Sequence, residues 1–184
     1  NLLREDNSEI ETLANDLLIN VTSFFRDPNV FDHLAATTIH DLVAKQPTDR
    51  PIRIWSVGCS TGEEIYSLAI LFREQIIAQK RNVKIQLFAS DIDADAVASA
   101  RDGIYPDTIE TEVSSHRLDR FFTKEIVGYR ISQELRSMIV FTVQDVSSDP
   151  PFAKLDMISC RNLLIYLQPE AQSKVIALFH FALR

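Results

Sequence analysis

Residues 53–64, Arg-Ile-Trp-Ser-Val-Gly-Cys-Ser-Thr-Gly-Glu-Glu, decide the fold of this chain. The first five are mostly apolar and are typical of a buried strand. Gly58 and Gly62 allow a tight turn and a close approach of the backbone to a ligand. From Glu64 onward the apolar residues recur at helical spacing. A strand, a glycine loop and a helix in this order place a ligand beside the carboxyl end of the strand.

The loop after this strand matches neither of the common phosphate-binding patterns. It lacks the third glycine of the dinucleotide fingerprint and the Gly-Lys pair of a P-loop. Glu63 and Glu64 follow its glycines and would repel a phosphate near the start of the helix. An acidic mouth suits a ligand such as S-adenosylmethionine, which carries a sulfonium, an amine and no phosphate. An ordinary strand-to-helix turn with acids at the helix start explains the same residues, so both interpretations stay open.

The composition is typical of a soluble globular protein. The 184 residues are 46% hydrophobic and 24% charged, with a formal net charge of -7. This acidic balance argues against nucleic acid as a partner, because a nucleic-acid binder needs a basic face. No apolar run approaches a membrane span and no signal peptide opens the chain, so we expect no membrane insertion and a cytoplasmic location. Cys59 and Cys160 lack metal-ligand spacing. We therefore expect no metal site and two reduced thiols that lie close in space.

Strand and helix patterns alternate along the chain, which indicates an α/β fold with a mostly parallel sheet. We expect a helical segment over residues 1–50, with one helix beginning at a capping box in residues 8–11 and another at Asp27-Pro28. The main domain should occupy residues 51–184, with a small β appendage at about 122–143. The expected strands cover residues 53–57, 83–89, 126–131, 138–143 and 155–160, and later helices begin near residues 64, 94 and 169.

Two acids, Asp91 and Asp93, follow the second expected strand. Acids at this point of such a fold commonly hold ribose hydroxyls, whereas an aspartate just before a helix commonly caps it. We assign Asp91 to the ligand and Asp93 to the cap of a helix over residues 94–101, which should end at Gly103.

Four segments occur in a fixed order along the chain. They are residues 20–26 (Asn-Val-Thr-Ser-Phe-Phe-Arg), 58–64 (Gly-Cys-Ser-Thr-Gly-Glu-Glu), 90–93 (Ser-Asp-Ile-Asp) and 160–166 (Cys-Arg-Asn-Leu-Leu-Ile-Tyr). Together they resemble the CheR-type chemotaxis receptor methyltransferases over about residues 8–184. Each motif alone is weak, but the set is specific. The sequences of these segments are most similar to those of proteins that fuse this methyltransferase to methylesterase and sensory domains.

The resemblance implies a class I S-adenosylmethionine-dependent methyltransferase with a Rossmann-like sheet. S-adenosylmethionine would be the methyl donor, and the enzyme would O-methylate glutamate side chains. Its partners would be the cytoplasmic helices of chemotaxis receptors, with fused methylesterase and sensory domains as further candidates. In relatives a glycine-rich turn and further strands follow the position of Arg184, so we expect the C-terminal strands of the domain to be missing.

The resemblance also assigns site residues. Arg26 and Tyr166 would be catalytic, because an arginine can grip the acceptor carboxylate and the tyrosine would lie near the transferred methyl group. The expected cofactor-binding residues are Asn20, Thr22, Arg26, Gly58, Glu63, Glu64, Asp91, Asp145, Val146, Arg161 and Asn162. Which of the two glutamates meets the methionine amine stays open, and many relatives carry Asn where this chain has Asp145. Without the family, Arg26 is more often a surface arginine and Tyr166 more often a core residue.

Two other functions fit parts of the sequence. Residues 149–152 (Asp-Pro-Pro-Phe) are similar to a motif of amino-methyltransferases that act on nucleic-acid or protein nitrogens, but here they precede a strand instead of following one. The chain could also be a non-catalytic signalling module that binds the cofactor, against which Arg26, Asp91 and Asn162 argue. A glutamate carboxylate is already ionised at neutral pH and needs no general base, and none is evident, which favours O-methylation.

Overall fold

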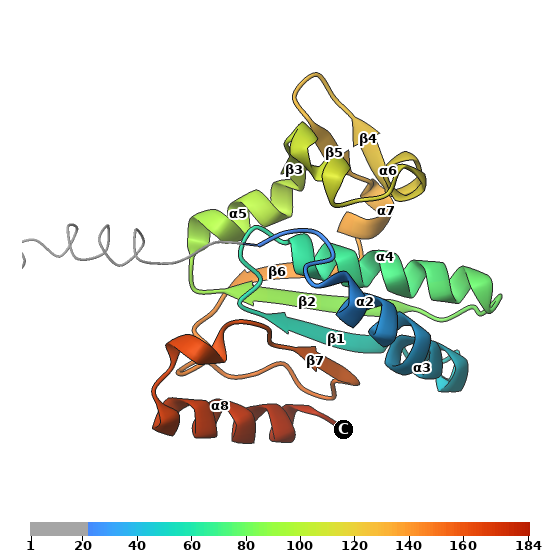
Figure 1. Ribbon diagram of the computed structural model, residues 1–184. Helices are drawn as coiled ribbons and strands as arrows, with labels where there is room; N and C mark the ends of the chain where they lie inside the picture. Colours follow the sequence, from blue (N-terminus) through green and yellow to red (C-terminus); the bar gives the residue numbers. More distant parts are fainter. Residues whose placement is uncertain (1–21) are drawn as a thin grey trace, which may run out of the picture.

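The computed structural model describes residues 22–184 of the chain, and Figure 1 shows helices on both faces of a central sheet. The capping box at residues 8–11, the helix expected after it and Asn20 lie outside the described residues, so those expectations stay predictions.

Four parallel strands form the central sheet, in the order β6-β2-β1-β7. They are β1 (Ile52–Val57), β2 (Ile85–Asp91), β6 (Ile139–Val143) and β7 (Met157–Ser159). From β1 the chain moves outward to β2 and β6, and then returns to the other side of β1 to form β7. In sheets of this class, ligands bind outside the carboxyl ends of the strands at the point where the order reverses.

The two faces of the sheet support separate hydrophobic cores, because successive side chains of a strand point to opposite faces. Ile54 of β1 and Leu87 of β2 belong to the larger core, whereas Trp55 and Phe88 belong to the smaller one. Helix α8 (Pro169–Ala182) closes the smaller core, partly through Val175. In Figure 1 this helix lies beneath the sheet, and α4 (Glu63–Ala78) lies above it.

Helices α4 (Glu63–Ala78) and α5 (Ala94–Asp102) cover the face with the larger core. The side chain of Asp93 accepts hydrogen bonds from the N–H groups of Asp95 and Ala96 at the start of α5, and Gly103 follows its last residue. Both predicted caps of this helix are therefore confirmed. No helix in the described part of the chain is both long and apolar enough to cross a membrane.

A helical segment precedes β1 and packs on the larger core. It consists of α2 (Pro28–Leu34), the π-helical turn η2 (Ala35–Ile39) and α3 (His40–Lys45), with Phe31, Ile39 and Val43 among the core residues. Helix α2 begins at Pro28, as predicted. Asp27 occupies the N-cap position, but its side chain makes no cap hydrogen bond and instead pairs with Arg161. The helix therefore starts where predicted, although the Asp27 carboxylate does not cap it.

A small antiparallel sheet in the order β3-β5-β4 forms the β appendage, at the top of Figure 1. Its elements are β3 (Ile104–Tyr105), the 3₁₀ turn η3 (Asp107–Thr111), α6 (Ser115–Phe121), β4 (Phe122–Lys124), β5 (Tyr129–Ile131) and α7 (Gln133–Arg136). The predicted extent of about 122–143 is wrong at both ends. The appendage begins at Ile104, and the run Ile139–Val143 pairs with β2 in the main sheet. A run rich in β-branched residues suits a strand of either sheet. Its sequence alone therefore does not tell which sheet it joins.

Candidate active site

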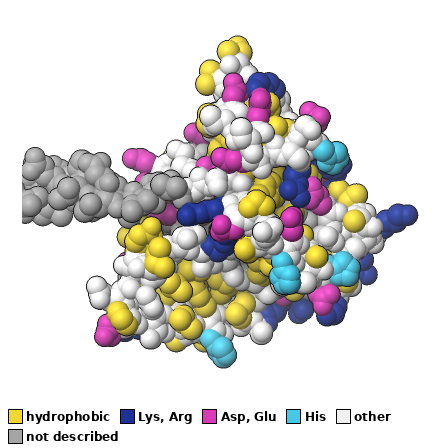
Figure 2. Space-filling model, in the orientation of Figure 1, with side chains coloured by type: hydrophobic (Ala, Val, Ile, Leu, Met, Phe, Trp, Pro, Cys, Tyr) yellow, Lys and Arg dark blue, Asp and Glu magenta, His cyan; other side chains and the backbone are white. Residues whose placement is uncertain are grey.

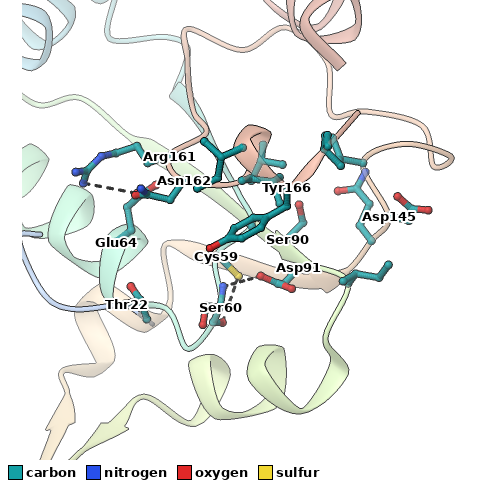
Figure 3. Close-up of a pocket in the computed structure, with 18 of the residues that line it drawn as sticks. Thr22, Cys59, Ser60, Glu64, Ser90, Asp91, Asp145, Arg161, Asn162 and Tyr166 are labelled. Atoms are coloured by element: carbon teal, nitrogen blue, oxygen red, sulfur yellow. Dashed lines mark hydrogen bonds and ion pairs between the residues drawn. The ribbon is translucent and has the colours of Figure 1, made fainter. Parts of the chain in front are cut away.

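A pocket of about 460 Å³ lies at the carboxyl ends of the four parallel strands (Figure 3). Segments that follow β1, β2, β6 and β7 build its wall, together with residues just before α2. The predicted site residues in this wall are Thr22, Arg26, Gly58, Glu64, Asp91, Asp145, Val146, Arg161, Asn162 and Tyr166. The volume is that of a small-molecule site. The fold therefore brings together residues that are spread over most of the chain.

The glycine loop leads from β1 to α4, lines the pocket and is hydrogen-bonded to the end of β2. The backbone N–H groups of Gly58 and Cys59 both donate to the carbonyl oxygen of Ser90, at 2.9 and 3.0 Å. Gly58 has a φ of +70°, and a Cβ there would lie 3.4 Å from the side chain of Leu163 in the opposite wall. That distance is an ordinary van der Waals contact, so it is the left-handed backbone at this position that calls for glycine.

Gly62 allows the start of α4 to pack closely on α5. Its φ is +96°, and a Cβ at this position would lie 2.9 Å from the Cβ of Ala100 on α5. Real Cβ atoms do not approach so closely, so only glycine lets the start of α4 pack on α5 in this way. The Tyr105 hydroxyl donates to the carbonyl oxygen of Thr61 at 2.7 Å, which ties the β appendage to the same turn.

Asp91 ends β2 and organises the loop beside the pocket. Its Oδ2 accepts a hydrogen bond from the backbone N–H of Ser60 at 2.7 Å, and its Oδ1 accepts one from the N–H of Asp93 at 3.0 Å. An ionised carboxylate offers about four acceptor sites, so about two remain for a ligand. Asp93 caps α5, as predicted, and Asp91 lines the pocket, where its contact with a ligand stays a prediction.

The structure separates the two glutamates at the start of α4. Glu64 lines the pocket, and its Oε1 accepts a hydrogen bond from the Ser56 hydroxyl at 3.0 Å. The carboxylate of Glu63 accepts from the Thr61 hydroxyl at 2.7 and 2.9 Å, and burial raises its pKa. Neighbouring residues on a helix point about 100° apart, so only one of the pair faces the pocket. Of the two glutamates left open by the sequence, Glu64 is the one that lines the pocket, and a contact of either with the cofactor stays a prediction.

A twisted segment before α2 carries Arg26 to the pocket. The residues on either side of Arg26 have φ values of +50° and +60°. The backbone N–H of Phe24 donates to Glu112 Oε2 at 2.8 Å, and that of Phe25 donates to the Ser67 hydroxyl at 3.0 Å. Both phenylalanine rings are buried in the larger core. These contacts fix the backbone next to Arg26, whose side chain lines the pocket.

The segment after β7 supplies the opposite wall. The guanidinium of Arg161 donates to Asp27 Oδ2 at 2.5 Å and lies 3.8 Å from Glu64 Oε2. Asn162, with a φ of +59°, and Tyr166, at the end of the 3₁₀ turn η4 (Leu164–Tyr166), line the pocket beside it. Tyr166 is 57% exposed, and its ring extends over the pocket in Figure 3. It is a rim residue and not a core residue.

The loop after β6 supplies Asp145 and Val146. Val146 is buried in the smaller core and gives the pocket an apolar wall. The carboxylate of Asp145 accepts hydrogen bonds from the N–H of Ser147 at 2.8 Å and the hydroxyl of Ser148 at 3.0 Å. Asp145 therefore holds the turn that presents Val146, in addition to lining the pocket.

Several residues of the pocket wall were not predicted from the sequence. They are Ser23, Ser60, Ser90, Ile92, Gln144 and Ile165, among others. Ser90, Ile92 and Gln144 lie at or just beyond the ends of parallel strands. The rule that ligands bind at the carboxyl ends of such strands, applied to every strand, would have found these three.

Both cysteines are free thiols, with Cys59 buried and Cys160 half-buried. Burial raises the pKa of Cys160 to about 11 and raises that of Cys59 well above its ordinary range. The strands that precede them are neighbours, since Ser56 of β1 lies opposite Ser159 of β7. Within residues 22–184, no three His, Cys, Asp or Glu side chains gather so as to hold a metal ion.

The family described as "CheR methyltransferase, SAM binding domain" matches residues 20–184. The chain belongs to the CheR methyltransferase family. It is 40% identical over 183 residues to the "uncharacterized 104.1 kDa protein in hypE 3'region" of Rhodobacter capsulatus, covering 100% of this chain and 19% of that protein. It is 31% identical over 176 residues to chemotaxis protein methyltransferase 2 of Vibrio cholerae, covering 94% of this chain and 60% of that protein.

A second relative named chemotaxis protein methyltransferase 2, from Pseudomonas aeruginosa, is 35% identical over 181 residues, covering 95% of this chain and 62% of that protein. The CheR chain thus spans about three fifths of the length of these two relatives and 19% of the Rhodobacter protein. Among solved structures, magnesium protoporphyrin IX methyltransferase from Synechocystis PCC 6803 with bound SAH aligns over 84% of this chain and 51% of its own, with 20% identity and a TM-score of 0.45.

The family assignment confirms the predicted resemblance, the class I methyltransferase fold and S-adenosylmethionine as the cofactor. The parallel sheet with helices on both faces agrees with this fold.

Proposed function

We propose that this CheR domain transfers the methyl group of S-adenosylmethionine to glutamate side-chain carboxylates of chemotaxis receptors. The observation that carries the proposal is the composition of one pocket wall: the carboxylates of Glu64 and Asp91 share it with Arg26 and Tyr166. A pocket with both acidic groups and an arginine suits a cationic donor beside an anionic acceptor. The names of the Vibrio and Pseudomonas relatives support this reading.

The chemistry of the pocket fits S-adenosylmethionine. Asp91 has free acceptor capacity beside the glycine loop, which suits ribose hydroxyls. Glu64, oriented by Ser56, suits the methionine ammonium group. Val146 offers an apolar surface for the adenine ring. When bound, the cofactor supplies an electrophilic methyl group on a positively charged sulfur.

The chain itself must hold and orient the acceptor. A glutamate carboxylate is ionised at neutral pH, so the reaction needs no general base. Arg26 can donate a hydrogen bond to one carboxylate oxygen and leave the other oxygen free to attack. Its position is fixed because the flanking backbone is tied to α4 and to Glu112. Correct alignment of the reacting groups then supplies much of the rate enhancement.

Tyr166 stands at the rim, where an incoming side chain must pass. More than half of its surface is exposed, and it follows the exposed Ile165 in the same 3₁₀ turn. Its hydroxyl can orient the acceptor carboxylate, while the apolar surface beside it displaces water from the reacting groups. We therefore assign the acceptor side of the pocket to Arg26 and Tyr166.

The amino-methyltransferase alternative is not favoured. The ring of Phe152 stacks on Phe88 at 4.3 Å between centroids and meets Trp55 edge-on at 5.3 Å, within the smaller core. Asp149 accepts a hydrogen bond from the N–H of Asp145 and so closes a turn. The Asp-Pro-Pro-Phe segment therefore has a packing role. A non-catalytic module is also disfavoured, because Arg26 and Tyr166 both reach the pocket.

Because the chain covers only part of its relatives, the partners are also part of the proposal. The receptor's cytoplasmic helices would be the substrate, and the reaction would take place in the cytoplasm. The chain matches 19% of the 104.1 kDa relative, which leaves room in that protein for further domains, and methylesterase and sensory domains are the companions that we propose.

The test uses labelled S-adenosylmethionine and a helical cytoplasmic fragment of a chemotaxis receptor. We expect the label to enter the fragment and to be lost when the fragment's glutamates are replaced by alanine. A matched fragment with its lysines replaced by arginine should still be labelled. Label that survives removal of the glutamates, or that disappears with the lysines, would refute the proposed acceptor.

A further inference from the structure

Arg161 lies between two carboxylates and makes unequal contacts with them. Its Nη2 donates to Asp27 Oδ2 at 2.5 Å, whereas its Nη1 lies 3.8 Å from Glu64 Oε2. The first distance is a charge-assisted hydrogen bond, and the second is an ion pair beyond hydrogen-bond length. The guanidinium also lies over the Phe31 ring, 5.2 Å from its centroid. Asp27 and Phe31, both from the segment around α2, thus hold the guanidinium, and Asp27 rather than Glu64 lies within hydrogen-bond distance of it.

Asp27 contacts Arg161 instead of capping its own helix. It stands at the N-cap of α2, where an aspartate side chain commonly accepts a backbone hydrogen bond worth about 1 kcal/mol. Here it has a φ of +60° and makes no such bond. Its side chain is 63% exposed, while that of its partner Arg161 is only 22% exposed. The carboxylate is therefore directed to the arginine at the pocket wall and not to its own helix.

The contact between Asp27 and Arg161 matters because Glu64 can pair closely with only one cation, either the guanidinium or a ligand amine. Its Oε1 is held by the Ser56 hydroxyl, and its Oε2 faces Arg161. A guanidinium that closed onto Oε2 would neutralise the carboxylate and repel an incoming ammonium group. We propose that Asp27 is a positioning residue for the cofactor amine: by holding Arg161, it keeps Glu64 available to that amine. This inference rests on the proposed function, in which Glu64 receives the methionine ammonium.

Three ligands separate this role from a general structural one. S-adenosylhomocysteine has the amine and the carboxylate, decarboxylated S-adenosylmethionine keeps only the amine, and methylthioadenosine has neither. The variant Asp27→Asn removes the charge but tolerates the left-handed backbone. We expect this variant to lower the affinity for the first two ligands about fivefold, as for the loss of a partly exposed ion pair. The affinity for methylthioadenosine should stay unchanged. Titration calorimetry measures all three affinities.

Two controls complete the experiment. Asp32→Asn makes the same charge change at an exposed position of α2 and should leave every affinity unchanged. In an Arg161→Met background, Asp27→Asn should have no further effect, because the arginine through which it acts is gone.

Three results would overturn the inference: unchanged binding of the amine-bearing ligands, an equal loss for methylthioadenosine, or a loss that persists without Arg161. Failure of the unaltered chain to bind S-adenosylhomocysteine at all would instead overturn the proposed function, and this inference with it.

Discussion

Asp91→Ala is the substitution whose effect can be worked out most fully from the structure. The carboxylate already accepts hydrogen bonds from the backbone N–H groups of Ser60 at 2.7 Å and Asp93 at 3.0 Å. Its remaining capacity is assigned to the ribose. A hydrogen bond to a charged group contributes about 1.5–3 kcal/mol, which converts to a loss of affinity for S-adenosylhomocysteine of about 10- to 150-fold. The two backbone groups left without an acceptor should also lower the free energy of unfolding by about 1–3 kcal/mol.

Titration calorimetry with S-adenosylhomocysteine and thermal unfolding measure the two effects separately. The matched control is Asp93→Ala, two residues away. It removes the cap of α5, where the carboxylate accepts from Asp95 and Ala96, and should cost about 1 kcal/mol of stability without changing affinity. Equal affinity in the unaltered chain and in Asp91→Ala, or an equal loss in both variants, would refute the assignment of Asp91 to the cofactor.

Three further predictions concern other parts of the pocket. Arg26→Ala should lower the rate of methyl transfer much more than it lowers cofactor affinity, because its proposed partner is the acceptor; equal losses in kinetics and calorimetry would make Arg26 a cofactor ligand. Glu112→Ala removes the acceptor for the N–H of Phe24 and should reduce kcat several-fold while Glu112→Gln, which still accepts, restores it; a null effect of both would show that this anchor does not position Arg26. Thiol counting on the denatured, unreduced chain should find Cys59 and Cys160 both free, and in the folded chain Cys160 should react faster as the pH rises toward its pKa of about 11; a count of zero thiols would contradict this.

Features set by neighbouring residues could be predicted from the sequence. The glycine loop, the helix after it, the place of Asp91 at the pocket and the cap at Asp93 depend on a few residues that follow one another in the chain. The strand that ends at Asp91 positions that side chain at the sheet edge, and the helix that starts at Ala94 accounts for Asp93. Local rules for strand ends and helix caps apply directly to such features.

Features that depend on contacts between residues far apart in the chain could not be predicted from the sequence. Glu63 and Glu64 have the same chemistry, and the packing of α4 on the core and on α5 decides which of them faces the pocket. The pattern of Ile139–Val143 fits the appendage as well as the main sheet, and its pairing with β2 depends on residues far away in the chain. Asp27 and Arg161 pair across most of the chain, and no local pattern marks that contact.

The measurement that tests the central claim most directly is the stability of the transferred methyl group in alkali. Methyl esters of glutamate hydrolyse in mild base, whereas N-methyl groups survive it. Receptor fragments labelled by this chain should therefore release their label as volatile methanol on mild alkaline treatment, at a rate independent of which variant made the product. Label that remains on the protein after alkali, or that is found on DNA in a mixture of both substrates, would contradict the account of this chain as a glutamate O-methyltransferase.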